Sequence, residues 1–157
     1  MRIPNIRCFV LMMIIAIVLT GCSGGTPTGP AMNFTGNWTM KNTATISSIE
    51  GIGVGETITA ICSINDNNGS LSIYKVYIIG QESINWEMGY GTRSGNKLTA
   101  NINGSYLKIN GDRVSVSLSF EGEINTDGIS GTGYWSQSFN DNNFIDSASG
   151  TTVFVKG

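Results

Sequence analysis

The sequence feature that most limits the fold is a two-residue alternation of apolar and polar side chains that returns between short turns. In Arg113–Phe120 the apolar set is Val114, Val116, Leu118 and Phe120, and the other positions hold arginine or serine. Successive side chains of a strand point to opposite faces, so this alternation indicates a strand with one buried face. Similar segments, alternating or rich in β-branched residues, occupy 34–41, 56–64, 70–79, 83–92, 97–103 and 150–156. No segment carries an apolar stripe at helical spacing, so helices are not expected there.

Turn-forming residues separate these segments, for example in Asn65–Gly69, Asn110–Asp112 and Thr126–Gly128. Asn, Asp and Gly accept the positive φ angles that tight hairpins need. Short hairpins between sequential strands favour an all-β fold, a single antiparallel up-and-down β-barrel of about eight strands, with a β-sandwich as the alternative. A barrel of that size encloses either a packed interior or a pocket for one small ligand.

The N-terminus carries a different signal, an uninterrupted apolar run over Phe9–Leu19 that follows Arg2 and Arg7. The run is shorter than the about 20 residues that a membrane-spanning helix needs, and its length and basic flank are typical of a signal peptide. The residues Leu19-Thr20-Gly21-Cys22 resemble the lipobox of bacterial lipoproteins at every position. The resemblance implies cleavage before Cys22 and lipidation of that cysteine. The alternative is an ordinary secretory signal with a chance cysteine.

These features predict a lipoprotein signal peptide over 1–21, a lipidated cysteine and flexible tether over 22–32, and a lipocalin-like barrel domain over 33–157. The tether is rich in glycine and proline and carries no charge. The predicted location is the cell envelope, with the membrane as a partner through the lipid anchor. Ser23, rather than an inner-membrane retention aspartate, follows Cys22. The outer membrane is therefore expected in a Gram-negative cell, and otherwise the outer face of the cytoplasmic membrane.

The first strand opens with Gly36-Asn37-Trp38, which resembles the Gly-x-Trp opening of lipocalins and related calycin barrels. The closing segments Gly128–Thr132 and Gly150–Lys156 resemble the last strands of small bacterial lipocalin-like lipoproteins. The resemblance implies that Trp38 closes the floor of the barrel. Two positions depart from these families. Lipocalins place an arginine on the last strand over the tryptophan, where the nearest basic residue of this chain is Lys156. Gly36–Thr39 also resembles the Gly-x-Trp-Thr opening of avidin-like proteins, but Met40 stands where those proteins have a biotin-contacting asparagine, so biotin binding is not expected.

The composition offers little for catalysis. The chain has no histidine, which removes the commonest general base and the commonest catalytic metal ligand. Cys62 is the one thiol expected to remain besides Cys22, and its apolar surroundings predict burial. No catalytic residue, metal site or cofactor is predicted, and the protein is not expected to be an enzyme. Glu121 and Glu123 share one side of a strand, and a solvated face is favoured there over a glycosidase-type carboxylate pair.

Charge and turn composition disfavour nucleic-acid binding and calcium binding. Nine basic residues stand against eleven acidic ones without clustering into a basic stripe, so nucleic-acid binding is not expected. The turns around Asp66 and Asp141 are rich in asparagine, but neither fits the EF-hand spacing, so turn formation is favoured over calcium binding.

Four aromatic residues are the ligand-binding candidates, because alternation places each on the apolar face of its strand: Trp38, Trp86, Tyr90 and Trp135. Two function hypotheses follow. In the first, a lipid-anchored barrel holds a small hydrophobic ligand. In the second, a non-enzymatic lipoprotein has a packed barrel and turns its surface toward a partner or a glycan. Tyr134 points away from Trp135, and an exposed aromatic row is suited to stacking on sugars.

Overall fold

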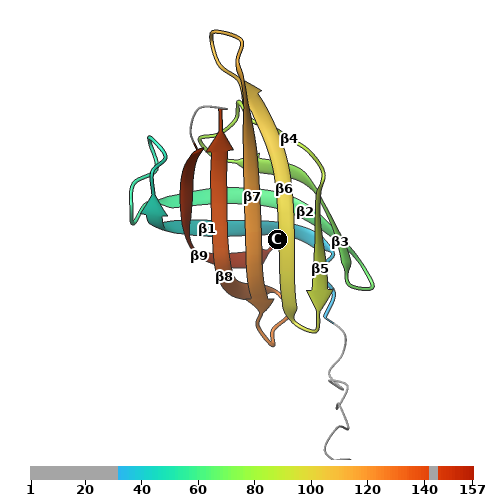
Figure 1. Ribbon diagram of the computed structural model, residues 1–157. Coiled ribbons are helices and arrows are strands. Elements are labelled where there is room, and N and C mark those ends of the chain that lie inside the picture. The colour runs from blue at the N-terminus through green and yellow to red at the C-terminus, as the bar shows by residue number, and fades with distance from the viewer. Residues whose placement is uncertain (1–31, 142–144) are drawn as a thin grey trace, which may run out of the picture. The chain divides into compact units, whose positions relative to one another are not determined.

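The computed structural model describes residues 32–141 and 145–157, and every regular element in these ranges is a β-strand (Figure 1). The strands are β1 Gly36–Ser47, β2 Thr57–Asn67, β3 Ser70–Ile78, β4 Asn85–Trp86, β5 Gly89–Ser94, β6 Lys97–Leu107, β7 Arg113–Ile124, β8 Ser130–Asn140 and β9 Ile145–Lys156. No helix of membrane-spanning length and apolarity occurs within these two ranges. The predicted signal peptide, Cys22 and most of the tether lie outside the described residues.

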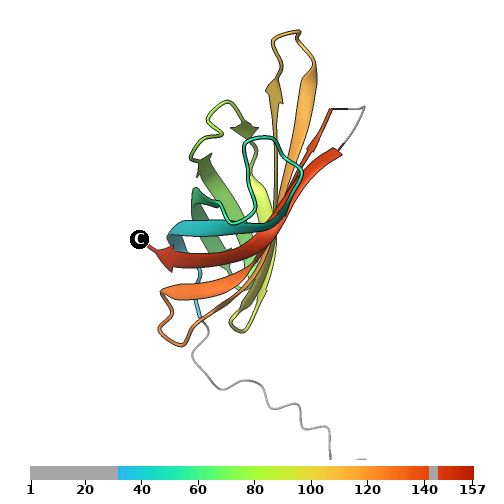
Figure 2. The same cartoon turned by 90° about the vertical axis from the view of Figure 1, so that its left-hand side faces the viewer.

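The strands form one closed antiparallel barrel. Each strand pairs with the next in the order β1, β2, β3, β5, β6, β7, β8 and β9, and β9 returns to pair with β1. The two-residue strand β4 is additional and pairs with the upper part of β6. Figures 1 and 2 show the strands curving around a common interior. The predicted eight-stranded up-and-down barrel is therefore confirmed, and the sandwich alternative does not form.

Aromatic side chains fill the barrel at the end where the described chain begins. The ring of Trp38 lies 5.9 Å from that of Phe34 and 5.6 Å from that of Phe154, measured between centroids. Its indole Nε1 donates a 2.7 Å hydrogen bond to the Phe34 carbonyl. Lys156 on β9 holds its ammonium 5.8 Å from the centroid of the Trp38 ring. Lys156 thus approaches the Trp38 ring from the last strand.

The stretch from Trp86 to Tyr90 departs from the predicted alternation. Trp86 pairs with Gly104 of β6, whereas Tyr90 pairs with Asn101, so four steps along one strand match three along the other. This one-residue β-bulge reverses the side-chain direction after β4. Tyr90 consequently points outward and is 65% exposed. The interior position expected for Tyr90 is wrong, and Gly89 takes the inward position against Ile102 instead.

The two ends of the barrel differ in what they carry. At the floor, Met32 packs against the core just before β1. The hairpins that follow β2, β5 and β7 also lie at this end. At the opposite end, which we call the mouth, lie the connections 48–56, 79–84 and 108–112, together with the end of β8 and the start of β9. Figure 2 shows the β6–β7 hairpin extending from the mouth. Among the described residues, a ligand that approaches the mouth therefore meets three separate connections and the ends of β8 and β9.

Candidate binding surfaces

Trp38 and Trp135 face the barrel interior, as predicted. Their side chains are 2% and 3% exposed. The indole nitrogen of Trp135 donates to the Thr43 carbonyl at 3.4 Å, so each indole has a hydrogen-bond partner within the barrel. Both rings line the interior space and pack as part of the hydrophobic core.

Trp86 and Tyr90 occupy different surroundings. Trp86 is half-buried and packs against the core from β4, and its indole nitrogen has no hydrogen-bond partner in the described structure. Tyr90 lies on the outside of β5. The four predicted aromatic residues therefore do not converge on one site. The bulge between β4 and β5 turns Tyr90 away from the interior.

The interior is filled by side chains. The remaining cavity measures about 20 Å³ and is lined by two tryptophans, three phenylalanines, Asn42 and smaller apolar side chains. About 10–15 Å³ of such space holds one water molecule, so the cavity has room for a water but not for an organic ligand. Two buried polar atoms without partners, Asn42 Oδ1 and Thr152 Oγ1, belong to a cross-strand pair of β1 and β9. A buried water is the group that best satisfies atoms of this kind.

The outer wall of β6, β7, β8 and β9 is a lattice of small uncharged polar side chains. Cross-strand pairing aligns them in rows, such as Asn101, Ser119, Ser136 and Ser149. The next row toward the mouth holds Asn103, Ser117, Ser138 and Ser147. None of these eight residues is buried. The wall therefore presents hydroxyl and amide groups to solvent at the regular spacing of strands, about 4.8 Å.

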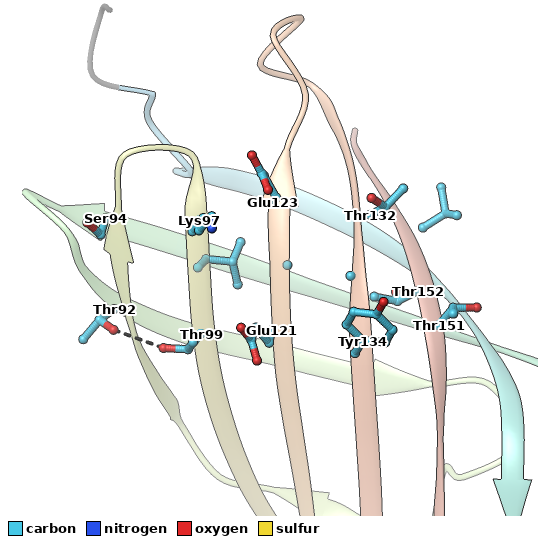
Figure 3. Close-up of a pocket in the computed structure, with 14 residues that line it drawn as sticks. Thr92, Ser94, Lys97, Thr99, Glu121, Glu123, Thr132, Tyr134, Thr151 and Thr152 are labelled. Carbon is cyan, nitrogen blue, oxygen red and sulfur yellow. Dashed lines mark hydrogen bonds between the residues drawn. The ribbon is translucent and has the colours of Figure 1, made fainter. Parts of the chain in front are cut away.

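Toward the floor, this lattice ends in a hollow of about 590 Å³ (Figure 3). One row across its centre joins Thr99 of β6, Glu121 of β7, Tyr134 of β8 and Thr151 of β9. Figure 3 shows these side chains projecting from neighbouring strands on the same side of the sheet. Tyr134 is 69% exposed, so one face of its ring is free to stack on a ligand. The outward direction predicted for Tyr134 is confirmed.

The charged groups of the hollow differ in how they are held. Glu123 accepts a hydrogen bond from the amide of Asn96, which fixes it at the edge. Glu121 has no hydrogen bond or ion pair in the described structure, and Lys97 makes no salt bridge there. Thr92 and Thr99 share a 3.1 Å hydrogen bond between their hydroxyls. The centre of the hollow therefore combines an unengaged carboxylate with an aromatic ring and threonine hydroxyls.

A buried ion pair near the floor was not foreseen from the sequence. Arg93 Nε donates to Asp66 Oδ2 at 2.6 Å, and the two side chains are 12% and 1% exposed. The Asp66 carboxylate also accepts from the backbone nitrogens of Phe34 at 3.1 Å and Gly69 at 2.9 Å. Burial raises the pKa of this carboxyl, but the hydrogen bonds from Arg93, Gly69 and Phe34 outweigh it and hold the pKa below its usual value. Asp66 is thus a structural carboxylate, not a free metal ligand.

Comparison with known proteins adds no relative. No family model, no curated protein and no solved structure matches this chain. Residues 32–141 and 145–157 contain no group of three acidic or cysteine side chains that converges as a metal site does. The likeness to calycin barrels therefore rests on the eight-stranded antiparallel architecture itself.

Proposed function

We propose that the protein is a lipid-anchored, non-enzymatic protein of the cell envelope that binds a glycan on the outer wall of β5–β9. The observation that carries this proposal is the filled interior, because a cavity of about 20 Å³ leaves no room for the hydrophobic ligand of the alternative hypothesis. Binding surfaces must then lie outside the core. The hollow around Tyr134 is a concave outer surface with an exposed aromatic ring.

The chemistry of the wall suits a sugar polymer. A sugar ring offers hydroxyl groups along its edge and an apolar face of C–H groups. Serine, threonine and asparagine side chains both donate and accept hydrogen bonds, so they match either role of a sugar hydroxyl. The Tyr134 ring provides an amphipathic surface for the C–H face. A linear polymer laid across the strands meets the same lattice at each strand, which supports many weak contacts in place of one deep pocket.

The anchor supports a role at the envelope. Ser23–Met32 reaches at most about 33–36 Å when extended, which keeps the barrel close to the membrane. Two or three acyl chains on Cys22 give stable anchoring, since each buried methylene contributes about 0.8 kcal/mol. In a cell with an outer membrane, the absence of an aspartate after Cys22 favours that membrane. Incorporation of labelled fatty acid that is lost in Cys22→Ala tests the anchor separately from glycan binding.

Cosedimentation of the purified full-length protein with insoluble peptidoglycan tests the glycan proposal. Tyr134→Ala is expected to weaken binding about fivefold, in line with the loss of one stacked aromatic contact of about 1 kcal/mol. Tyr74→Ala is the matched control, because Tyr74 is also exposed but lies on β3, the strand across the barrel from β8. The control is expected to bind like the parent protein.

Three outcomes contradict the proposal. The first is equal loss of binding in both variants, or no binding by the parent protein. The second is an apolar ligand that copurifies in native mass spectrometry, which restores the hydrophobic-ligand hypothesis. The third is glycan hydrolysis that disappears in Glu121→Gln or Glu123→Gln, which makes the protein an enzyme.

A further inference from the structure

A second hollow, of about 560 Å³, opens at the mouth of the barrel, opposite the floor closed by Trp38. We call it the mouth cup. Its lining comes from the connection after β1, the connection after β3, the β6–β7 hairpin, and the facing ends of β8 and β9. Its size falls within the range of about 300–1,000 Å³ typical of small-molecule sites, which often occupy the mouths of β-barrels.

The bottom of the mouth cup is apolar and held in place. Ile52, Ile84 and Val114 line it, and each is less than a tenth exposed. On one side Tyr106 and Phe139 form an edge-to-face pair with their ring centroids 6.3 Å apart. These side chains already pack against one another, so a ligand meets a preformed apolar surface that costs little to order.

A pair of side-chain amides, those of Gln81 and Gln137, connects the mouth cup with the buried interior. Gln81, which lines the cup, and the buried Gln137 exchange two hydrogen bonds, with nitrogen–oxygen distances of 2.7 and 3.2 Å. Each primary amide has two donor hydrogens and two acceptor lone pairs. The pair therefore leaves hydrogen-bonding capacity on Gln81 toward the cup while it fixes the position of that side chain.

The charge of the mouth cup is unbalanced. Its lining contains three carboxylates, those of Glu50, Asp141 and Asp146, and one ammonium, that of Lys108. Lys108 Nζ already pairs with Asp141 Oδ2 at 2.8 Å, and this bond raises the pKa of the lysine. The remaining carboxylates, Glu50 and Asp146, make no ion pair within the described ranges.

Asp146 is the distinctive member of this lining. It lies on the same face of β9 as Ala148 and Gly150, the face that points into the barrel, and it is only half-buried. Its carboxylate makes no hydrogen bond or ion pair within the described residues. An inward-facing charged group without a counter-charge is costly unless solvent or a ligand meets it. The carboxylates of the mouth cup do not form a three-ligand metal cluster among the described residues, so an organic cation suits the position better than a metal ion.

We propose that the mouth cup binds a small amphipathic amine, with its ammonium on Asp146 and its apolar body on Ile52, Ile84 and Val114. The carboxylate supplies the charge, Gln81 offers a hydrogen bond, and the Tyr106–Phe139 pair forms an aromatic wall. This site is separate from the hollow around Tyr134 and does not depend on the glycan proposal. A bound amine supplies Asp146 with the counter-charge that Lys108 supplies to Asp141.

Phenethylamine is a suitable probe, because it joins an ammonium to an aromatic body of the size the cup accepts. Binding to the full-length protein in neutral detergent is measured by equilibrium dialysis at low ionic strength. Two analogues isolate the charge: 2-phenylethanol has the same body without charge, and 3-phenylpropionate carries the opposite charge. Asp146→Asn removes the charge at nearly constant shape. Glu87→Gln is the matched control, because Glu87 is an exposed carboxylate outside the mouth cup.

Saturable binding of phenethylamine is expected, with affinity about fivefold or more lower in Asp146→Asn and within about twofold of the parent protein in Glu87→Gln. Neither analogue is expected to compete. Raising the salt concentration is expected to weaken binding, because the site is open to solvent. No saturation at concentrations up to about 10 mM overturns the proposal. Equal affinity of the parent protein and Asp146→Asn also overturns it, and so does competition by 2-phenylethanol.

Discussion

Replacing Asp66 by asparagine is the sharpest test of how the floor of the barrel is held together. The carboxylate joins three segments that are far apart in the sequence: it accepts from Phe34 before β1, from Gly69 in the β2–β3 turn, and from Arg93 on β5. Its side chain is 1% exposed, so water does not replace these bonds readily. The carboxylate therefore ties the start of the described chain to the far side of the floor.

The expected loss of stability in Asp66→Asn follows from the burial of the Asp66–Arg93 ion pair. Asparagine keeps one carbonyl oxygen as an acceptor but loses the negative charge opposite Arg93. Removing one partner of a buried ion pair costs about 3–5 kcal/mol. Arg93 is 12% exposed and keeps a 3.4 Å hydrogen bond to the Gly95 carbonyl, so it is partly compensated. We expect a loss of about 3 kcal/mol in the free energy of unfolding, at the lower end of that range.

Urea denaturation of the full-length protein, followed by tryptophan fluorescence, measures this loss. With a slope of about 2 kcal/mol/M, the expected change lowers the midpoint by about 1.5 M at constant slope. Glu87→Gln removes an exposed carboxylate of the same charge and is expected to change stability by less than about 0.5 kcal/mol. A loss below about 1 kcal/mol for Asp66→Asn, or a similar loss in Glu87→Gln, refutes the argument.

The pH dependence gives an independent check on the same carboxylate. Because the folded protein holds the pKa of Asp66 below its unfolded value of about 3.9, the ionised form stabilises the fold above that pH. This contribution is lost as pH falls through the folded pKa. The difference in urea midpoint between the parent protein and Asp66→Asn should therefore narrow below about pH 4. A difference that stays constant down to the acid limit contradicts the assignment.

Two further predictions concern the core. In Gly131→Ala the added Cβ overlaps the ring of Phe154 and the backbone oxygen of Glu123, so thermal or urea unfolding should show a loss of about 1–3 kcal/mol. Gly53→Ala meets only the flexible Glu56 side chain, and equal losses in the two variants would contradict the steric argument. Burial raises the pKa of the Cys62 thiol to about 12, so a thiol reagent at pH 8 should modify it in urea but not in the folded protein. Fast modification of the folded state would show that the core opens.

The strand pattern and the two interior tryptophans were predictable from the sequence because they depend on local rules. Val114, Val116 and Leu118 alternate with polar residues, and all three are buried. Alternation also placed Trp38 and Trp135 inside correctly. It failed for Tyr90, because one extra residue between β4 and β5 reverses every later side chain of that segment. No local signal in Glu87-Met88 marks that bulge, which is set by pairing with β6.

By itself, the sequence determined that this chain is an antiparallel β protein. The proposed envelope anchor rests on the sequence alone, on Leu19-Thr20-Gly21-Cys22. Only the tertiary structure decided whether the barrel is open or filled, because interior volume depends on how side chains from opposite strands meet. Trp38, Phe154 and Phe120 close that space from three different strands. The hollow around Tyr134 and the mouth cup also depend on how side chains from different strands meet. Glu121 and Tyr134 become neighbours through cross-strand register, and closure of the barrel brings Asp146, Ile52 and Ile84 into the lining of one hollow.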